Sequence, residues 1–198
     1  MARTRVVVIL MLIVISIISG CVSYPNPETW KLPAREDAKS AMFIGRIGLP
    51  NNKDENPDGF VLRLDAVDFR ERSRAIYFGN GEESFVMSNN YFVVPNIKSG
   101  KYHLAGFNTG KVYNTLPLDD EDLIEIKPGQ IKFVGSYDYL NIEQGVLSKI
   151  VGLSGSYNLR QAKKPTELEM LQWLNRIGNG SGWEPTIKKR IRELGGKP

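Results

Sequence analysis

The fold of this chain is built around Tyr91-Phe92-Val93-Val94-Pro95-Asn96-Ile97-Lys98-Ser99-Gly100-Lys101-Tyr102-His103-Leu104. The apolar segment from Tyr91 to Val94 has the length and the β-branched content of a strand. A turn signal at Lys98-Ser99-Gly100 ends it, and a second strand is expected over Lys101 to Asn108. Alternation places Tyr102 and Leu104 on one face of that strand. We therefore expect a β-hairpin that contributes these two side chains to a core.

Strand-length segments separated by turn signals lie on both sides of this hairpin. Phe60 to Asp68 alternates most clearly, with Phe60, Leu62 and Leu64 on the same face. Further strands are expected over Ser40 to Leu49, Ala75 to Phe78, Ser84 to Ser88, Leu123 to Ile126, Gln130 to Tyr137 and, weakly, Lys149 to Leu153. Seven or more short strands with frequent turns predict a mainly β protein, an antiparallel β-sandwich over residues 40–162.

A helical pattern replaces the strand pattern in residues 163–198. Thr166 and Glu169 have the spacing of a capping box at a helix start. Leu168, Leu171 and Leu174 then recur at helical spacing, until a glycine-rich segment at 178–182 ends the helix.

A second helix is expected to begin near Pro185, a residue favoured in the first helical turn. Ile187, Ile191 and Leu194 form its apolar stripe, and Gly195-Gly196 ends it. Helices this short are not stable alone in water. We therefore expect both to pack on the sandwich as a C-terminal helical hairpin.

The hairpin at 91–104 resembles the central hairpin of transthyretin-like, carboxypeptidase-regulatory-like domains, which carry an apolar strand, a Pro and Gly turn, and then Lys-Tyr and an apolar residue. Lys127-Pro128-Gly129-Gln130 is similar to the turn of their next hairpin. The resemblance covers at most Ala41 to Tyr139 and implies an Ig/transthyretin-like sandwich. In that family the domain is usually an accessory or binding module, so the resemblance implies no catalytic residue and no cofactor.

The first twenty residues have the pattern of a secretory signal. Arg3 and Arg5 give a positive start, and residues 6–19 form an almost purely apolar run. That run is shorter than the roughly 20 apolar residues that a membrane-spanning helix needs. An uncleaved membrane anchor is therefore the less favoured alternative.

The exit of this run, Ile18-Ser19-Gly20-Cys21, resembles the lipobox of bacterial lipoproteins. The resemblance implies cleavage before Cys21, a diacylglyceryl group on its sulfur, and a fatty acyl group on the new amino terminus. Two or more acyl chains hold a protein stably on a membrane, whereas one does not. The proline-rich residues 21–39 are then expected to form a lipidated tether. Val22 is not the Asp that commonly retains lipoproteins at the inner membrane, so the resemblance favours the outer membrane, facing the periplasm.

Charge and cysteine content restrict the function classes. Arg3 and Arg5 account for two of the four net positive charges of the 198-residue chain, so the mature protein is close to neutral. No aromatic-interleaved basic stripe indicates nucleic-acid binding. Cys21 is the single cysteine, which excludes an internal disulfide and any multi-cysteine zinc or iron–sulfur site. We therefore expect no metal and no cofactor.

Two parts of the sequence are candidates for catalysis. His103 is the only histidine, and a general base or metal ligand would have to use it. Its place in an alternating strand favours a hydrogen-bonded structural histidine instead. Gly152-Leu153-Ser154-Gly155-Ser156 is an incomplete match to the nucleophile elbow, because a serine stands where the last glycine belongs. The sequence thus predicts no catalytic residue.

Asp54, Asn56, Asp58 and Gly59 match the first half of a calcium-binding loop, with Asp65 at the twelfth position. Alternate oxygen ligands and a glycine turn are what a hard cation requires. The competing interpretation is a polar turn between strands, since Asn, Asp, Pro and Gly are ordinary turn residues.

Two charged clusters remain. The acidic cluster Asp119-Asp120-Glu121-Asp122 is interpreted as a solvated loop, with binding of a cation or a basic partner as the alternative. In the last helix, Lys188, Lys189, Arg190 and Arg192 are interpreted as a solvated face, with contact to anionic lipid headgroups as the alternative.

Together these patterns predict an envelope-anchored lipoprotein, not an enzyme, whose β-sandwich acts as a binding or envelope-assembly module. Its expected contacts are the membrane, through the lipid on Cys21, and an envelope protein partner. The alternatives are a lipid-anchored cell-envelope hydrolase that uses carboxylates and a calcium-stabilised adhesion module.

Overall fold

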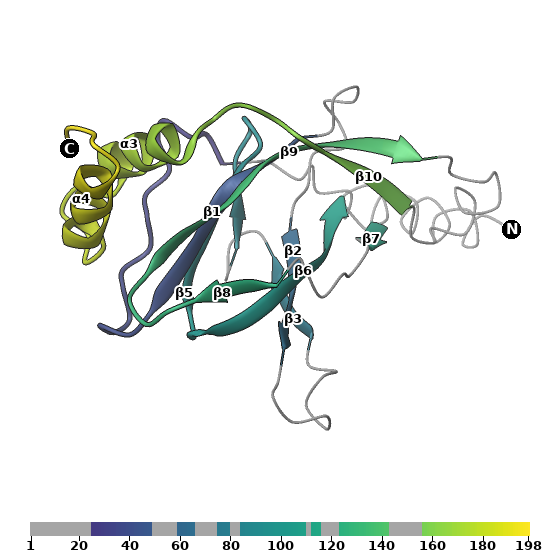
Figure 1. The fold of residues 1–198 in the computed structure, drawn as a ribbon, viewed down its shortest axis with the longest axis horizontal. Helices are drawn as coiled ribbons and strands as arrows, with labels where there is room; N and C mark the ends of the chain where they lie inside the picture. The colour runs from purple at the N-terminus through teal and green to yellow at the C-terminus, as the bar shows by residue number, and fades with distance from the viewer. Residues whose placement is uncertain are drawn as a thin grey trace, which may run out of the picture.

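The computed structural model describes residues 25–48, 59–65, 75–79, 84–109, 112–115, 123–142 and 156–198. Ten strands and two helices lie in these residues (Figure 1). The strands are β1 (Ala41–Gly48), β2 (Gly59–Asp65), β3 (Ala75–Gly79), β4 (Phe85–Val86), β5 (Tyr91–Ile97), β6 (Gly100–Thr109), β7 (Val112–Thr115), β8 (Ile124–Ile126), β9 (Ile131–Ile142) and β10 (Ser156–Gln161). The helices are α3 (Glu167–Ile177) and α4 (Glu184–Glu193).

The strands form one continuous sheet that closes over on itself. Its order is β3-β2-β6-β7-β10-β9-β1-β5-β4, and β8 pairs with β6. Strands β1 and β5 are far from β6 and β8 in this order, yet the side chains of all four enter one core, so the two parts of the sheet face each other. This β-rich sandwich with two short C-terminal helices confirms the predicted fold class. Most pairs are antiparallel, while β1–β9 and β10–β7 are parallel.

Strand β1 is the centre of the molecule because both of its faces are buried. Phe43 points into the core between the two parts of the sheet, where its ring meets the edge of Tyr102 from β6 at a centroid distance of 5.4 Å. Met42 and Ile44 point the other way, into a second core under the helices. A strand covered on both faces reads as a continuous apolar run, which is how Ala41 to Gly48 reads, apart from Arg46.

The sandwich core also confirms the predicted hairpin. Tyr102 is 1 % exposed and Leu104 packs against the same cluster. The remaining buried members come from β1, β4, β5, β6 and β8, and are Ala41, Ile47, Val86, Phe92, Val94, Ile97, Phe107 and Ile126.

The helical hairpin lies at one end of the molecule, beside β1 and away from β2 and β3 (Figure 1). Helix α3 begins at the predicted capping box, in which the Thr166 hydroxyl accepts from the Glu169 N–H and the Glu169 carboxylate accepts from the Thr166 N–H. Pro185 lies in the first turn of α4, also as predicted. The helices bury Leu171, Leu174 and Ile187, among others, against the outer face of the sheet.

The segment before β1 is packed onto this body. We call residues 25–40 the N-terminal strap. Leu32 is 8 % exposed within the second core, and the Trp30 ring stacks on Trp173 at a centroid distance of 6.4 Å. At its far end, Asn96 donates to the carbonyl of Ala34 and accepts the N–H of Glu36. The range 21–39 is the expected tether, and the structure describes it from Pro25 onward. This described part covers apolar surface, because Trp30 and Leu32 pack into the second core.

The strands differ from expectation at β7, β9 and β10. Strand β9 extends to Ile142, beyond the predicted end at Tyr137, and β10 pairs with this extension through six register partners from Ser156 to Gln161. Strands β7 and β10 were not predicted. The weak strand expected over Lys149 to Leu153 lies outside the described residues.

Candidate functional site

Two hollows flank the helical hairpin. The larger, which we call the junction groove, has a volume of about 650 Å³ and lies where the ends of β1, β5 and β9 meet the start of α3. Its walls carry charged, amide and aromatic groups: Arg46, Asn89, Tyr91, Asp138, Ala162, Lys164, Pro165 and Glu169.

A partly buried ion pair lies on the sheet side of the groove. Arg46 Nη1 and an Asp138 carboxylate oxygen are 2.8 Å apart, and the two side chains are 24 % and 19 % exposed. Parallel pairing of β1 with β9 sets Gly48 opposite Asp138, which brings the Arg46 side chain within reach. Arg160, the register partner of Asp138 on β10, approaches the other carboxylate oxygen at 3.5 Å. The Asp138 carboxylate thus lies between two guanidinium groups.

The helix side of the groove is set by the first residues of α3. The backbone N–H of Thr166 and the ammonium of Lys164 both donate to Glu169, and these bonds hold the pKa of that carboxyl below its ordinary value. Below them, the buried Ser136 hydroxyl donates to the carbonyl of Pro165 at 2.5 Å, which joins β9 to the entry of the helix.

Tyr91 forms the aromatic wall between these two sides. Its ring meets the edge of Trp173 at a centroid distance of 5.2 Å. Burial raises the pKa of the Tyr91 phenol, and the charge of Glu169 adds to the effect. Tyr91 therefore keeps its proton at neutral pH and can donate a hydrogen bond.

Both carboxylates of the groove are engaged in contacts with other groups. A general acid in glycoside hydrolysis requires a carboxyl with a raised pKa. Asp138 is held between cations, and Glu169, whose pKa is lowered, caps a helix. Paired cations and anions beside an aromatic ring instead offer donors and acceptors to a polar ligand.

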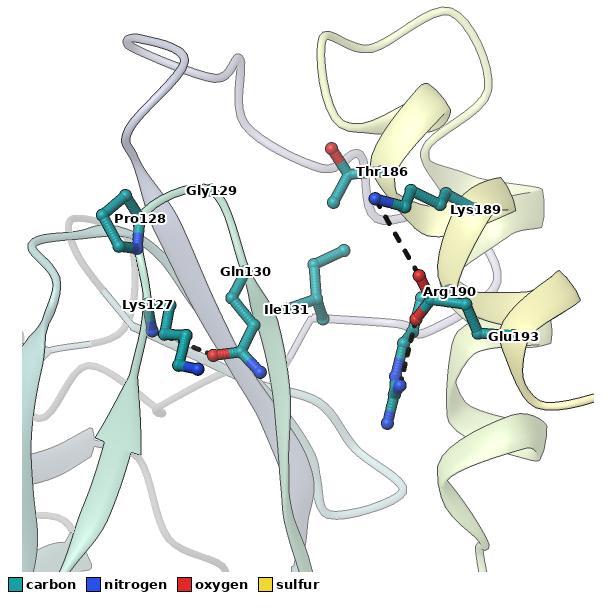
Figure 2. Close-up of a pocket in the computed structure, with 9 residues that line it drawn as sticks. All are labelled: Lys127, Pro128, Gly129, Gln130, Ile131, Thr186, Lys189, Arg190 and Glu193. Carbon is teal, nitrogen blue, oxygen red and sulfur yellow. Dashed lines mark hydrogen bonds and ion pairs between the residues drawn. The ribbon is translucent and has the colours of Figure 1, made fainter.

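The smaller hollow, of about 290 Å³, lies between the β8–β9 turn and α4 (Figure 2). Lys127 and Gln130 form the sheet wall, and Lys189, Arg190 and Glu193 form the helix wall. The Arg190 guanidinium donates to Glu167 at 2.8 and 3.2 Å and to Glu193 at 3.1 Å. The hydrogen bonds from Arg190 to Glu167, with those to Glu193, raise the pKa of Arg190.

Three of the four basic side chains of α4, those of Lys188, Lys189 and Arg190, lie close to carboxylates. Lys188 lies 2.5 Å from Glu184, a contact that lowers the pKa of Glu184, and Lys189 lies 4.0 Å from Glu193. Arg192 donates to the carbonyl of Lys188. This pairing favours the solvated-face interpretation over contact with anionic lipid.

His103 lies in β6 and is 9 % exposed. Its Nδ1 atom has no hydrogen-bond partner among the described residues, which differs from the hydrogen-bonded histidine that we expected. Within all the residues that the structure describes, no group of three or more His, Cys, Asp or Glu side chains is placed to hold a metal ion.

Three sequence candidates lie outside the described residues: the lipidation site Cys21, the loop Asp54–Asp58 and the acidic cluster Asp119–Asp122. Of the incomplete elbow at 152–156, only its last residue, Ser156, is described, as the first residue of β10. In the described part of the chain, no helix is long and apolar enough to cross a bilayer.

Sequence reasoning did not find the junction groove. One signal was present: Arg46 is the single charged residue in the otherwise apolar run of β1. A charge in a strand buried on both faces requires a partner, and Asp138 provides it.

Comparison with known proteins leaves this chain without a family. No family model matches it. No curated protein matches its sequence either. Among solved structures, a DUF3823 family protein from Parabacteroides merdae aligns with 56 % of this chain at 14 % sequence identity and a TM-score of 0.28. The alignment spans about half, 53 %, of that protein's own chain.

Proposed function

We propose that this protein is an outer-membrane lipoprotein, held by acyl chains on Cys21 and facing the periplasm, whose body is a non-catalytic binding or envelope-assembly module. The observation that carries the proposal is the exit Ile18-Ser19-Gly20-Cys21 directly after a short apolar run. Val22 supports outer-membrane sorting because it is not an Asp. A transthyretin-like character of the body, based on the hairpin at 91–104, belongs to the same proposal.

The junction groove is the binding site in this proposal. Its volume of about 650 Å³ is within the range of ligand pockets, and its wall combines one aromatic ring with fixed polar groups. The roles of its carboxylates in an ion pair and in a helix cap support binding over hydrolysis.

Metabolic labelling with an alkyne fatty acid tests the anchor. The wild-type chain and a Ser23→Ala control should both carry the label, and Cys21→Ala should not. Mass spectrometry of the mature protein should place its amino terminus at position 21. An unlabelled wild type, or label that persists in Cys21→Ala, would refute the lipoprotein assignment.

Photocrosslinking in intact cells tests the binding role. A photoreactive amino acid in place of the exposed Lys164, on the groove, should capture a discrete adduct. The same residue in place of the exposed Lys98, in the β5–β6 turn, is the matched control. Equal capture at both positions, or none at 164, would contradict a binding site in the groove.

A further inference from the structure

The N-terminal strap forms hydrogen bonds with the rest of the domain only a few residues after Cys21. The carbonyl of Pro25 accepts the N–H of Ser88 at 3.1 Å, and the carbonyl of Pro27 accepts the indole N–H of Trp173 at 3.1 Å. The carbonyl of Asn26, between these two prolines, accepts the N–H groups of Thr29 and Trp30 and closes a turn there. The strap is therefore attached to the body from its first described residue.

This attachment leaves little length between the lipid site and the body. Cys21 and Pro25 are four residues apart, a span of at most about 14 Å even when fully extended. A compact domain of about 170 residues is roughly 40 Å across. The connection is thus too short to let the opposite side of the body reach the membrane.

Aromatic side chains gather at the point of attachment. We call Trp30, Phe85, Tyr91 and Trp173 the aromatic corner. Trp30 lies 5.0 Å from Phe85 and 6.4 Å from Trp173 between ring centroids, and Tyr91 lies 5.2 Å from Trp173. Trp30, Phe85 and Tyr91 are only partly buried. The amphipathic rings of Trp and Tyr favour the headgroup region of a bilayer.

The junction groove opens beside this corner, because Tyr91 belongs to both and Asn89 follows Ser88 in the same turn. Its charges occur as neighbouring cations and anions, Arg46 with Asp138 and Lys164 with Glu169. A surface with both signs fits headgroups that carry a phosphate and an ammonium. It does not require an anionic lipid.

We infer that the β4–β5 turn, the aromatic corner and the junction groove rest on the zwitterionic phospholipid headgroups of the leaflet that holds the Cys21 acyl chains. The inference rests on the proposed function, since it requires the lipid anchor. It deepens that function, because it names these headgroups as the ligand of the junction groove and so assigns this face of the body to the membrane.

Site-specific labels on the full-length lipidated protein test this orientation. Acylation consumes the thiol of Cys21, so an introduced cysteine is the only free one. Environment-sensitive fluorophores would be attached at Asn89→Cys and, as a second reporter in the same turn, at Ser88→Cys. Lys98→Cys is the matched control, since it is also exposed but lies at the other end of β5. The proteins would be reconstituted into phosphatidylethanolamine–phosphatidylcholine vesicles, with and without phosphatidylglycerol.

Labels at 88 and 89 should be quenched by brominated lipid and should resist aqueous iodide several-fold better than the label at 98, in both vesicle types. Protein that floats with the vesicles but shows equal iodide access at 89 and 98 would overturn the orientation and leave the anchor intact. Protection that appears only with phosphatidylglycerol would overturn the zwitterionic assignment. Protein that carries no acyl chain and stays off the vesicles would overturn both the orientation and the proposed function.

Discussion

The guanidinium of Arg35 lies over the indole of Trp183, with its carbon 4.8 Å from the ring centroid. Trp183 is fully buried at the start of α4. The same guanidinium donates to the carbonyls of Ala38 and Ser40 and to the hydroxyl of Thr186. One side chain of the strap therefore holds together the approach to β1 and the second helix.

Replacement of Arg35 should loosen this junction. Arg35→Ala removes the cation–π contact and three hydrogen bonds, and we expect a loss of about 2 kcal/mol in the free energy of unfolding. Arg35→Lys should recover only part of it, because an ammonium cannot reproduce the planar fork. Urea unfolding measures the effect, with the exposed Lys31→Ala as control. Equal midpoints for Arg35→Ala and Lys31→Ala would contradict the role of Arg35.

Ser136 should be sensitive despite its small size. It is 3 % exposed, and its hydroxyl donates to the carbonyl of Pro165. Ser136→Ala leaves that carbonyl without its partner, at an expected cost of about 1–2 kcal/mol. Thermal unfolding of this variant should be compared with that of Ser99→Ala, which changes an exposed serine. A Ser136→Ala protein as stable as the control would show that the bond does not stabilise the fold.

Glu169 should make stability depend on pH at the acidic end. The hydrogen bond from the Thr166 backbone, followed by that from Lys164, lowers the pKa of Glu169 from its ordinary 4.5. A carboxyl with a lowered folded-state pKa stabilises above its unfolded pKa, and this contribution is lost as the pH falls through the folded value. Glu169→Gln should therefore be less stable than wild type at pH 7, with a difference that shrinks below about pH 4.5. Urea titrations across this range test it, and a difference independent of pH would argue against the capping carboxylate.

Gly45 should tolerate no side chain. It pairs with Gly135 at the irregularity between β1 and β9, and a Cβ there would lie 2.6 Å from the Phe92 ring and 2.7 Å from the Gly135 carbonyl. The Gly135 backbone cannot move away without disturbing the parallel pairing of β1 with β9. We expect Gly45→Ala to cost about 1–3 kcal/mol, as overpacking does in cores. An unchanged denaturation midpoint would show that the two strands can separate at this point.

The elements found from sequence are those with a strong local signal. The hairpin at 91–104 was predicted from its apolar strand, its turn signal and the alternation after it, and α3 from the capping-box spacing and the recurring leucines. In both, the decisive interactions join residues close in the chain. Strand β10, Ser156 to Gln161, has no comparable signal, and its partner is the extension of β9. Four of its six residues are polar, so the segment is compatible with a loop until a free strand edge is available to pair with.

Local chemistry along the chain was thus sufficient for the β-rich class, the two C-terminal helices and the expectation of a lipid site at Cys21. Interactions over long sequence separations decided the rest. The strap lies against α3 and α4, more than 120 residues away, because its Trp30 and Leu32 complete an apolar core that neither helix can close alone. The junction groove exists because parallel pairing of β1 and β9 brings Arg46 to Asp138. Neither the strap–helix contact nor the Arg46–Asp138 pair can be read from a periodic pattern in the sequence, since each depends on where distant segments meet.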